Sequence, residues 1–373
     1  MDFNLTEDQK LIRDMVREFA EKELADLAAE FDEKREFPKG ILKKMGELGL
    51  LGLAIPEKFD GSEMDLLSII LATEEIAKTC ASTAVIFAIH NLVLSSAIAK
   101  FATDEQKKYL SKLATGKMLA GFGLMEPDSA DSISDLNLIA SKNGDEFILS
   151  GTKRMILGGD EADLFIVFAR DEMNNILIFV IEKGGFSLDS DDDTLGLHAA
   201  KCMTAKFDDC KISIENLLGN PTGQADYFKE IQEIGKLAIS AVGLGIAQTA
   251  LKLSIEHSGQ RKQFGQFIGE FEGLQWMMAQ MHTGIASMRN NLYHAVALKD
   301  EGKPAEKECA VAKLTSAQIT VKATIDAIQI RGGYGYMREY PLERMFRDAK
   351  ATEFILGTMQ TQKKIIAKKI QGK

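Results

Sequence analysis

The run Gln329-Ile330-Arg331-Gly332-Gly333-Tyr334-Gly335-Tyr336 ends a long stretch of helical periodicity and is the most informative segment of the chain. Its glycines predict the end of the helix and leave the backbone bare where a bulky ligand could lie against it. No predicted strand precedes the run, so it does not match the glycine fingerprint of a nicotinamide-binding βαβ unit. Taken alone, the run could equally be a helix-ending turn without a ligand.

The segment that leads into this run is predicted to be a helical bundle. After Pro221 the apolar positions follow the helical period in three long segments. These segments cover residues 225–258, 274–299 and 305–330, with Gly302-Lys303-Pro304 as the last break. Helices of this length suit a four-helix bundle. We assign this third domain to residues 226–373.

The N-terminal part is also predicted to be helical. Thr6 and the two acidic residues after it form a helix-start signal, and Pro38 predicts the start of a second helix. Apolar residues recur at helical spacing at Leu11, Met15, Phe19 and Leu24. Further helical patterns cover residues 66–77 and 84–101, and Thr103-Asp104-Glu105-Gln106 has the form of a capping box. We therefore predict a helical domain over residues 1–115.

The middle of the chain has the pattern of short strands. The apolar or alternating runs are residues 147–149, 164–168 and 176–180. Turn clusters separate them, at Asn143-Gly144-Asp145, Gly158-Gly159-Asp160 and Asn174-Asn175. This predicts a small β-barrel or β-sandwich domain over residues 116–225. The whole chain is thus of the α+β class, with a helical domain, a β domain and a helical bundle in that order.

Composition and charge exclude several classes of protein. The chain has 373 residues, 45% of them hydrophobic and 27% charged, which is typical of two or three packed domains. Its net charge of -10 and its lack of a basic stripe argue against nucleic-acid binding. No apolar run approaches the roughly 20 residues that cross a bilayer, and no basic segment opens a signal peptide. We expect a cytoplasmic protein without a membrane segment.

The cysteines and histidines do not predict a metal site. The four cysteines are scattered without a C-x-x-C pair, so they favour buried thiols over a disulfide framework or a zinc site. The five histidines include no H-E-x-x-H motif. We predict that the protein binds no metal.

The three-part order and several motifs together resemble the acyl-CoA dehydrogenase family. The run that begins at Gln329 is followed by Glu339, Arg344 and Asp348, as in the C-terminal signature of that family. Further matching runs are Glu126-Pro127, Asn216-Leu217-Leu218-Gly219, Arg261-x-x-Phe264-Gly265 and Arg347-Asp348-Ala349-Lys350. The resemblance extends over nearly the whole chain. It implies the fold of that family and FAD as the cofactor.

The resemblance also implies a flavin site shared between subunits. In the family, the glutamine and glycines of the signature meet the adenosine end of FAD held by a neighbouring subunit, and the arginine of Arg-x-x-Phe-Gly addresses its pyrophosphate. The corresponding positions are present here, at Arg261, Phe264, Gln329, Gly332, Gly333, Thr358 and Gln360. This favours retained FAD and a homodimer or homotetramer.

The carboxylate base of the family is missing from this chain. Family members remove the α-proton of an acyl thioester with a glutamate while the β-hydride passes to the flavin. Most carry that glutamate in a Glu-Gly-Thr run, where this sequence has Leu356-Gly357-Thr358. A subset supplies it from the first bundle helix, where this sequence has Gly235 followed by Lys236. Glu233 would point to another face of the helix, so we interpret it as a solvated glutamate.

The positions around the flavin ring are altered as well. The family has Thr-Glu-Pro where this chain has Met125-Glu126-Pro127, and Trp-Ile-Thr where it has Met155-Ile156-Leu157. Hydroxyl donors have become apolar groups. Asp131 and Glu272 bring negative charge toward an anionic cofactor, which weakens binding unless it is compensated. Arg331 stands where the family has an apolar side chain, and it is a candidate for that compensation.

His90 is the one histidine that the resemblance brings near the substrate. It lies on the helix that lines the acyl pocket of the family, so it is a candidate base and a candidate substrate contact, together with Lys236. Many ordinary family members carry the same His-Asn pair. A packed, hydrogen-bonded histidine is therefore the favoured interpretation.

Two functions remain open from the sequence. The first is an FAD enzyme that performs a non-standard oxidation or elimination on an acyl thioester, carried by CoA or an acyl carrier protein, with an electron-transfer flavoprotein as a candidate electron acceptor. The second is a catalytically degenerate subunit or binding protein of the same fold. We favour the first, because the positions that would contact FAD across a subunit interface are retained.

Overall fold

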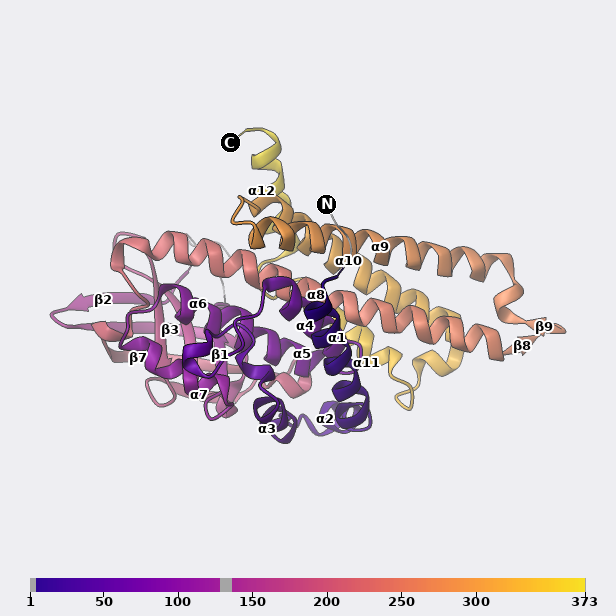
Figure 1. Ribbon diagram of the computed structural model, residues 1–373, viewed down its shortest axis with the longest axis horizontal. Coiled ribbons are helices and arrows are strands. Elements are labelled where there is room, and N and C mark those ends of the chain that lie inside the picture. The colour runs from indigo at the N-terminus through magenta and orange to yellow at the C-terminus, as the bar shows by residue number, and fades with distance from the viewer. Residues whose placement is uncertain (1–4, 128–135, 373) are drawn as a thin grey trace.

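The chain folds into three consecutive parts, which the computed structural model in Figure 1 shows side by side. The structure describes residues 5–127 and 136–372. Helices come first, a β-sheet second and long helices last, which confirms the predicted fold class. The sheet lies at one end of the elongated molecule (Figure 1). The hairpin of β8 (Lys262–Gln263) and β9 (Gln266–Phe267) lies at the other end.

The N-terminal part consists mainly of short helices. They are α1 (Glu7–Phe19), α2 (Ala28–Lys34), α3 (Lys39–Glu47), α4 (Leu66–Ala77), α5 (Ala81–Ala88), α6 (Ser96–Phe101) and α7 (Leu110–Ala114). Thr6 caps α1 in a capping box with Gln9, at 3.0 and 3.2 Å. Pro38 is the N-cap of α3, as its fixed φ favours, but α2 intervenes between α1 and α3.

The buried face of α1 differs from the prediction. Leu11 is 70% exposed and Met15 is 38% exposed, whereas Ile12 and Val16 are buried at 4% and 0%. Both pairs are spaced by four residues, so each forms an apolar stripe on a helix. The period alone cannot decide between the two stripes. Packing of α1 against α4 decides it in favour of Ile12 and Val16.

Two helical stretches correct the expectation that no apolar run is long enough to cross a bilayer. Residues Ala81–Phe101 and Pro221–Gln260 both reach the length and hydropathy of a membrane span. However, 78% and 83% of the residues in their most apolar windows are buried inside the protein. Such burial is typical of the core helices of a folded domain, since a helix that is apolar on all sides needs neighbours on all sides.

The middle part is a sheet whose strands match the predicted runs. They are β1 (Ala120–Gly123), β2 (Ile139–Asn143), β3 (Glu146–Ile156), β4 (Leu164–Arg170), β5 (Ile176–Glu182), β6 (Ser187–Asp191) and β7 (Met203–Ser213). The strand order is β1-β4-β2-β3-β7-β6, and β5 pairs with β4. The predicted turn at Gly144 joins β2 and β3, and its φ of 63° explains the glycine. Register shifts interrupt the β3–β7 pairing at Gly151 and near Ile156.

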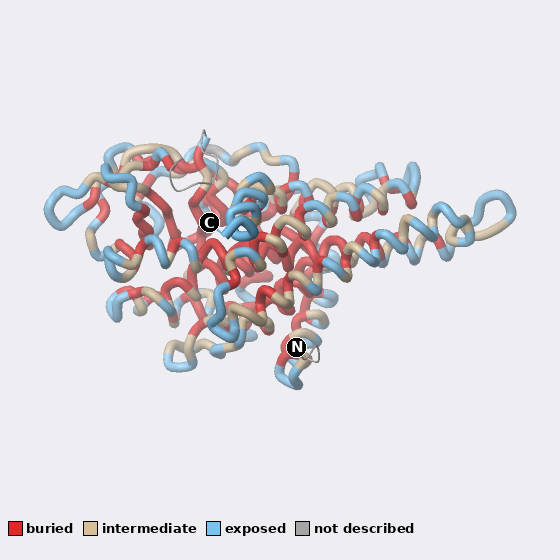
Figure 2. The backbone as a smooth tube through the Cα atoms, turned by 90° about the horizontal axis from the view of Figure 1, so that it is seen from above, coloured by how far each residue is buried: buried red, intermediate tan, exposed pale blue. Residues whose placement is uncertain are grey.

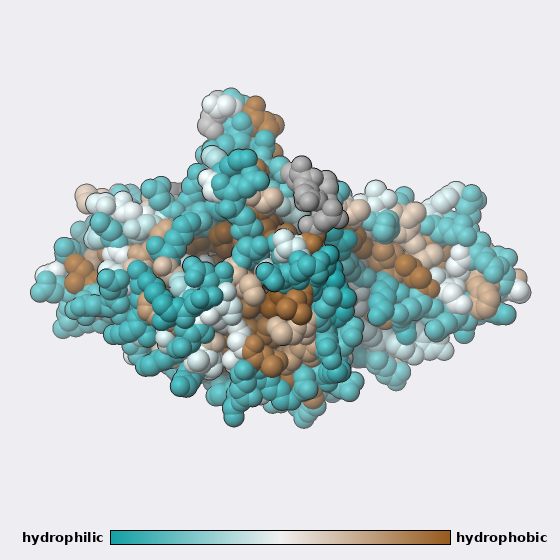
Figure 3. Space-filling view, in the orientation of Figure 1, coloured by the Kyte–Doolittle hydropathy of each residue, from teal (hydrophilic) through white to brown (hydrophobic). Residues whose placement is uncertain are grey.

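The C-terminal part is built around one long buried helix. Its helices are α8 (Gln224–Gln260), α9 (Glu272–Asp300), α10 (Glu306–Arg331), α11 (Leu342–Ala351) and α12 (Met359–Ile370). Figure 2 shows buried residues through the middle of the molecule and exposed residues toward the β8–β9 end. We call this end, from about Ile255 to Trp276, the helical arm. Figure 3 shows hydrophobic patches between hydrophilic side chains on it.

One buried amide joins the first two parts. The predicted capping box is confirmed, because Gln106 and Thr103 exchange hydrogen bonds of 3.1 and 3.3 Å. The same Gln106 amide donates to Glu215 O at 2.7 Å and to Leu217 O at 2.8 Å, and it accepts from Gly219 N at 3.1 Å. Gln106 is 5% exposed. It therefore satisfies backbone groups of two parts of the chain at once.

A second polar junction joins all three parts. The Arg347 guanidinium on α11 binds Asp32 on α2 with two hydrogen bonds, of 3.1 and 2.5 Å. His198, from the loop between β6 and β7, lies 3.1 Å from the same carboxylate. Burial opposes the ionisation of Asp32, but Arg347 outweighs it and the pKa of Asp32 is lowered. Next to Arg347, the Asp348 carboxylate accepts Leu197 N at 2.6 Å, while burial raises its pKa to about 6.

Replacing Gln106 should weaken the contact between the first two parts. Gln106→Ala leaves two carbonyls and two N–H groups without their partner, and each buried unsatisfied group costs about 1–3 kcal/mol. We expect the free energy of unfolding in urea to fall by about 3 kcal/mol. The matched control is Gln275→Ala, which removes one exposed amide that bonds to Gly269 O at 3.1 Å. An equal loss in both variants would contradict the role given to Gln106.

Asp348 should make stability depend on pH in a defined direction. Its folded pKa of about 6 lies above the ordinary 3.8, so its favourable contribution is full below about pH 4 and is lost as pH rises through 6. Asp348→Asn has no proton to lose and keeps an acceptor for Leu197 N. The advantage of the variant over wild type in unfolding free energy should grow from pH 5 to pH 7, toward about 3 kcal/mol. A difference that does not change with pH would contradict the buried, ionised carboxylate.

Candidate functional site

An apolar cavity lies where the β domain meets α11. Its volume is about 310 Å³. It is lined by Met125, Glu126, Pro127, Arg154, Met155, Asp192, Asp193, Thr194, Leu195, Gly196, Leu197, Cys202, Arg347, Lys350, Ala351 and Phe354. The structure thus brings Met125 and Met155 together, as the sequence predicted for a flavin pocket. Leu157 is buried beside them, in a bridge to Phe122, and does not line the cavity.

A buried ion pair fixes the backbone that follows Met125. Glu126 and Lys153 are both fully buried, with 2.6 Å between Oε1 and Nζ. Glu126 also accepts the N–H groups of Asn137 and Leu138. Burial lowers the pKa of Lys153 to about 8, although the charge of Glu126 opposes this. Because all of its partners are internal, this pair is a positioning element of the cavity rather than a free acid or base.

Asp192 positions Met155. It was not among the site residues predicted from the sequence. Met155 has a φ of 52°, which is strained for a residue with a side chain. Its N–H donates to Asp192 Oδ2 at 2.8 Å, and Asp192 Oδ1 receives Arg154 and Thr204, each at 3.0 Å. This carboxylate holds the irregular end of β3 that presents Met155 to the cavity. The run of aspartates around Asp192 offered no signal to single it out.

Gly235 and Leu356, which the family resemblance aligns with the two base positions, lie against each other. Gly235 is in α8, and Leu356 follows α11 with 1% exposure and a φ of 60°. A Cβ placed on Gly235 would lie 2.6 Å from Leu356 Cδ1 and 2.8 Å from Cδ2. The leucine therefore fills the space that the glycine leaves. Neither position carries a group that can accept a proton.

Glu233 is not the solvated side chain that we expected. It is 4% exposed, and its Oε2 bonds to Lys299 on α9 at 2.9 Å, while its Oε1 has no hydrogen-bond partner among the described residues. Glu233 is two residues from Gly235, so the helical spacing correctly places it on another face of α8. The spacing could not show that α9 covers that face. Lys236, the candidate substrate contact, is also buried, and burial lowers its pKa.

His90 lies in a closed environment. Its Nε2 lies 3.1 Å from Leu113 O, its Nδ1 accepts Ala120 N at 3.3 Å, and it is 1% exposed. Burial lowers its pKa to about 4, so the ring is neutral near pH 7. Both ring nitrogens are engaged by backbone groups. The geometry favours the packed histidine over a catalytic base or a substrate contact.

The remaining predicted cofactor residues form a second group at the far end of α8. From Gly235 to Arg261 there are 26 residues, which at about 1.5 Å per residue corresponds to about 39 Å. Phe264, beside Arg261, is 94% exposed. A Cβ on Gly332 or Gly333 would meet nothing within 4 Å, so the backbone there is open to a ligand. Arg261, the C-cap of α8, therefore lies far along the helix from Gly235.

Four predicted cofactor positions remain, and two of them follow Leu356 closely in the chain. Thr358 is the N-cap of α12, where its side chain accepts Thr361 N at 3.3 Å. Gln360 is exposed on the first turn of the same helix. Asp131 lies outside the described residues. Glu272 is exposed in the first turn of α9, where its negative charge favours the positive end of the helix.

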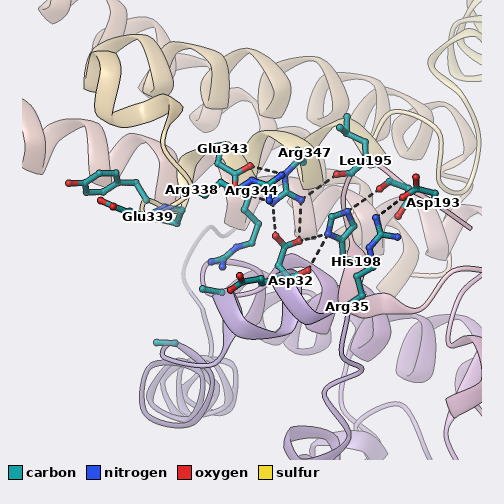
Figure 4. A pocket seen from close by; sticks show the side chains of 16 residues that line it. Asp32, Arg35, Asp193, Leu195, His198, Arg338, Glu339, Glu343, Arg344 and Arg347 are labelled. Carbon is teal, nitrogen blue, oxygen red and sulfur yellow. Dashed lines mark hydrogen bonds and ion pairs between the residues drawn. The ribbon is translucent and has the colours of Figure 1, made fainter. Parts of the chain in front are cut away.

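A charged cleft of about 1040 Å³ adjoins the apolar cavity and shares Asp193, Thr194, Leu195 and Arg347 with it. Figure 4 shows Asp32, His198 and Arg347 converging at its centre and Arg35 directed at Asp193, which it binds at 2.6 Å. Arg338 and Arg344 also line the cleft. Arg347 and Asp348 belong to one of the motifs in the sequence, but nothing in the sequence pattern pointed to Asp32 or His198.

The residues present fit FAD. The apolar cavity suits a flat ring system, the charged cleft beside it contains arginines for an anion, and Gly332 and Gly333 offer bare backbone. When bound, FAD would accept the hydride released in substrate oxidation. Among the described residues there is no group of three or more His, Cys, Asp or Glu side chains that could hold a metal ion.

Comparisons with known proteins agree with this geometry. The models of the acyl-CoA dehydrogenase N-terminal, middle and C-terminal domains match residues 6–117, 121–210 and 226–371. A short-chain specific acyl-CoA dehydrogenase of Clostridium acetobutylicum is 40% identical over 99% of this chain and 100% of its own length.

Two solved structures are similar over almost their whole length. Butyryl-CoA dehydrogenase from Megasphaera elsdenii has a TM-score of 0.95 at 36% identity and covers 100% of both chains. The prolyl acyl carrier protein oxidase AnaB has a TM-score of 0.93 at 30% identity and covers 98% of this chain and 100% of its own. With three matching domain models and relatives over its full length, the chain belongs to the acyl-CoA dehydrogenase family of FAD-dependent enzymes.

Proposed function

We propose that this flavoenzyme performs a non-standard oxidation or elimination on an acyl thioester, without a carboxylate at either base position of its family. The contact between Leu356 and Gly235 supports this most directly, because a leucine side chain occupies the place of the missing carboxylate. The positions expected to contact the adenosine and pyrophosphate of FAD are retained, at Arg261, Gln329, Gly332 and Gly333. Loss of the base together with retention of the cofactor site argues for altered chemistry.

The residues around the cavity would bind and orient rather than transfer a proton. Leu356 is buried, so it excludes water from the Gly235 side and has no atom that can take a proton. Met125 offers a thioether in place of a hydroxyl. A donor placed where charge develops is worth about 10² to 10³-fold in rate, so its loss should slow any reaction that builds negative charge on the cofactor ring.

Two carriers of the acyl group are compatible with this proposal, CoA and an acyl carrier protein. The relatives named above include enzymes of both kinds, a butyryl-CoA dehydrogenase and a prolyl acyl carrier protein oxidase. We propose an electron-transfer flavoprotein as the electron acceptor. A catalytically degenerate partner subunit is the competing proposal, and the same Leu356–Gly235 contact is the observation that favours it.

Leu356→Glu should create dehydrogenase activity. The new carboxylate would be buried against Gly235, where desolvation raises its pKa and suits it to accept a proton. Wild type should reduce its flavin slowly with butyryl-CoA or octanoyl-CoA, and the variant about 10² to 10⁴-fold faster. Anaerobic flavin reduction with a panel of acyl-CoA thioesters measures both. The gain should stay below that of an ordinary family member, because Met125 and Leu157 still donate no hydrogen bond.

Two control variants separate the carboxylate from changes in packing. Leu356→Gln introduces a side chain of the same shape as glutamate but without a group that accepts a proton. Its flavin should be reduced as slowly as that of wild type. Gly235→Glu should disturb packing by itself, because its Cβ would lie 2.6 Å from Leu356 Cδ1, whereas Gly235→Glu with Leu356→Ala has room. If Leu356→Glu holds FAD and gains nothing with any thioester, the degenerate-subunit proposal is preferred. Fast reduction of wild type would show that another base exists.

We also propose that the protein is a homodimer or a dimer of dimers. Arg261 lies about 39 Å along α8 from Gly235. The family resemblance gives Arg261 and the Gly332–Gly333 turn contacts with the cofactor of another copy. The helical arm exposes large apolar side chains (Figure 3), with Phe264 at 94%, Trp276 at 61% and Ile255 at 54% exposure. Light scattering should show at least a dimer. A stable, FAD-loaded monomer would contradict this assignment of the arm.

A further inference from the structure

Arg331 has an unusual environment at the end of α10. Its guanidinium carbon lies 4.1 Å from the centroid of the Tyr340 ring, which is a cation–π contact. Its Nε is buried and has no hydrogen-bond partner among the described residues. Gly332 and Gly333 follow directly, with open space where side chains would be. The guanidinium is thus held flat against an aromatic ring beside bare backbone.

A second guanidinium lies near the first. Burial lowers the pKa of His257, in the last turn of α8, and the positive charges of Arg331 and Arg261 lower it further. Both arginines are therefore close enough to affect one imidazole. Within the described ranges, no carboxylate oxygen lies within 4.0 Å of a guanidinium nitrogen of either arginine. Like charges gathered without a counter-charge are unfavourable unless an anion joins them.

We propose that Arg331 is a second anion-binding arginine of this protein, acting together with Arg261 on the phosphate-bearing part of an FAD molecule held by a neighbouring copy. The stacked guanidinium keeps its N–H groups free for a phosphate oxygen, which a planar fork binds with two parallel hydrogen bonds. The Gly332–Gly333 backbone lets the ligand approach closely. This inference deepens the cofactor assignment and does not depend on the reaction catalysed.

A purely structural role for Arg331 is the alternative. A cation in the last turn of a helix interacts favourably with the partial negative charge there. That role predicts an effect on stability and none on FAD affinity. Compensation of Glu272 within the same chain is a different possibility, but no ion pair joins Glu272 to Arg331 in the described part of the chain.

The test measures FAD affinity, not turnover. Apo protein is titrated with FAD, and binding is followed by the change in flavin fluorescence at low and high salt. Arg331→Leu should raise the Kd by about 10-fold or more at low salt, because hydrogen bonds to charged groups are the strong ones. The increase of Kd with salt should also be smaller in the variant, because one ionic contact is gone. Arg331→Gln should behave alike if Arg331→Leu does not fold.

The control is Lys322→Leu, which removes the same charge from the same helix where Lys322 bonds to Asp326 at 2.7 Å. It should leave the Kd unchanged. The proposal would be overturned if both Arg331→Leu and Arg331→Gln bound FAD with the Kd and salt dependence of wild type. Arg331 would then act only at the end of α10, on stability. The thermal midpoint of each apo variant separates that role from cofactor binding. Slow or absent turnover of wild type with thioesters would affect the proposed reaction but not this result.

Discussion

One polar junction holds the three parts of the protein together: Arg347 binds Asp32, and the buried Asp348 accepts Leu197 N. The loop from β6 to β7 packs so tightly on α11 that a Cβ on Gly196 would lie 2.4 Å from the backbone of Arg347. This packing forms one wall of the apolar cavity and of the charged cleft next to it. Because burial works against the ionised form of Asp348, the junction costs free energy that its hydrogen bond only partly offsets.

Inside this frame, the site combines strict polar positioning with an apolar centre. Glu126 bonds to Lys153 and to backbone N–H groups, which holds Met125 in place. Asp192 accepts Met155 N and the side chains of Arg154 and Thr204, which holds Met155 in place. The cavity itself is mostly apolar, and Leu356 fills the space that Gly235 leaves. An unpaired carboxylate buried at this place would cost free energy of folding, so it is expected only where the reaction uses it. The Leu356 side chain thus occupies the space that a side chain at position 235 would need.

The far end of α8 shows the opposite pattern. There the chain exposes Phe264, and within its described part neither Arg261 nor Arg331 forms an ion pair with a carboxylate. Both arginines act on the same imidazole, so this arrangement is unfavourable for an isolated chain in water. It becomes favourable when an anion and apolar surface are supplied from outside the chain.

The sequence by itself determined the order of helical, β and helical parts, the helix start at Thr6, the capping box at Thr103, and the absence of a carboxylate at Leu356 and Gly235. These features are local or lie at fixed motif positions, so spacing and residue type suffice to identify them. Only the tertiary structure decided that Ile12 rather than Leu11 faces the core, that Glu233 is buried on Lys299, and that Asp192 and Asp32 build the site. Each of these depends on contact between residues far apart in the chain, and periodicity carries no information about which neighbour covers a face.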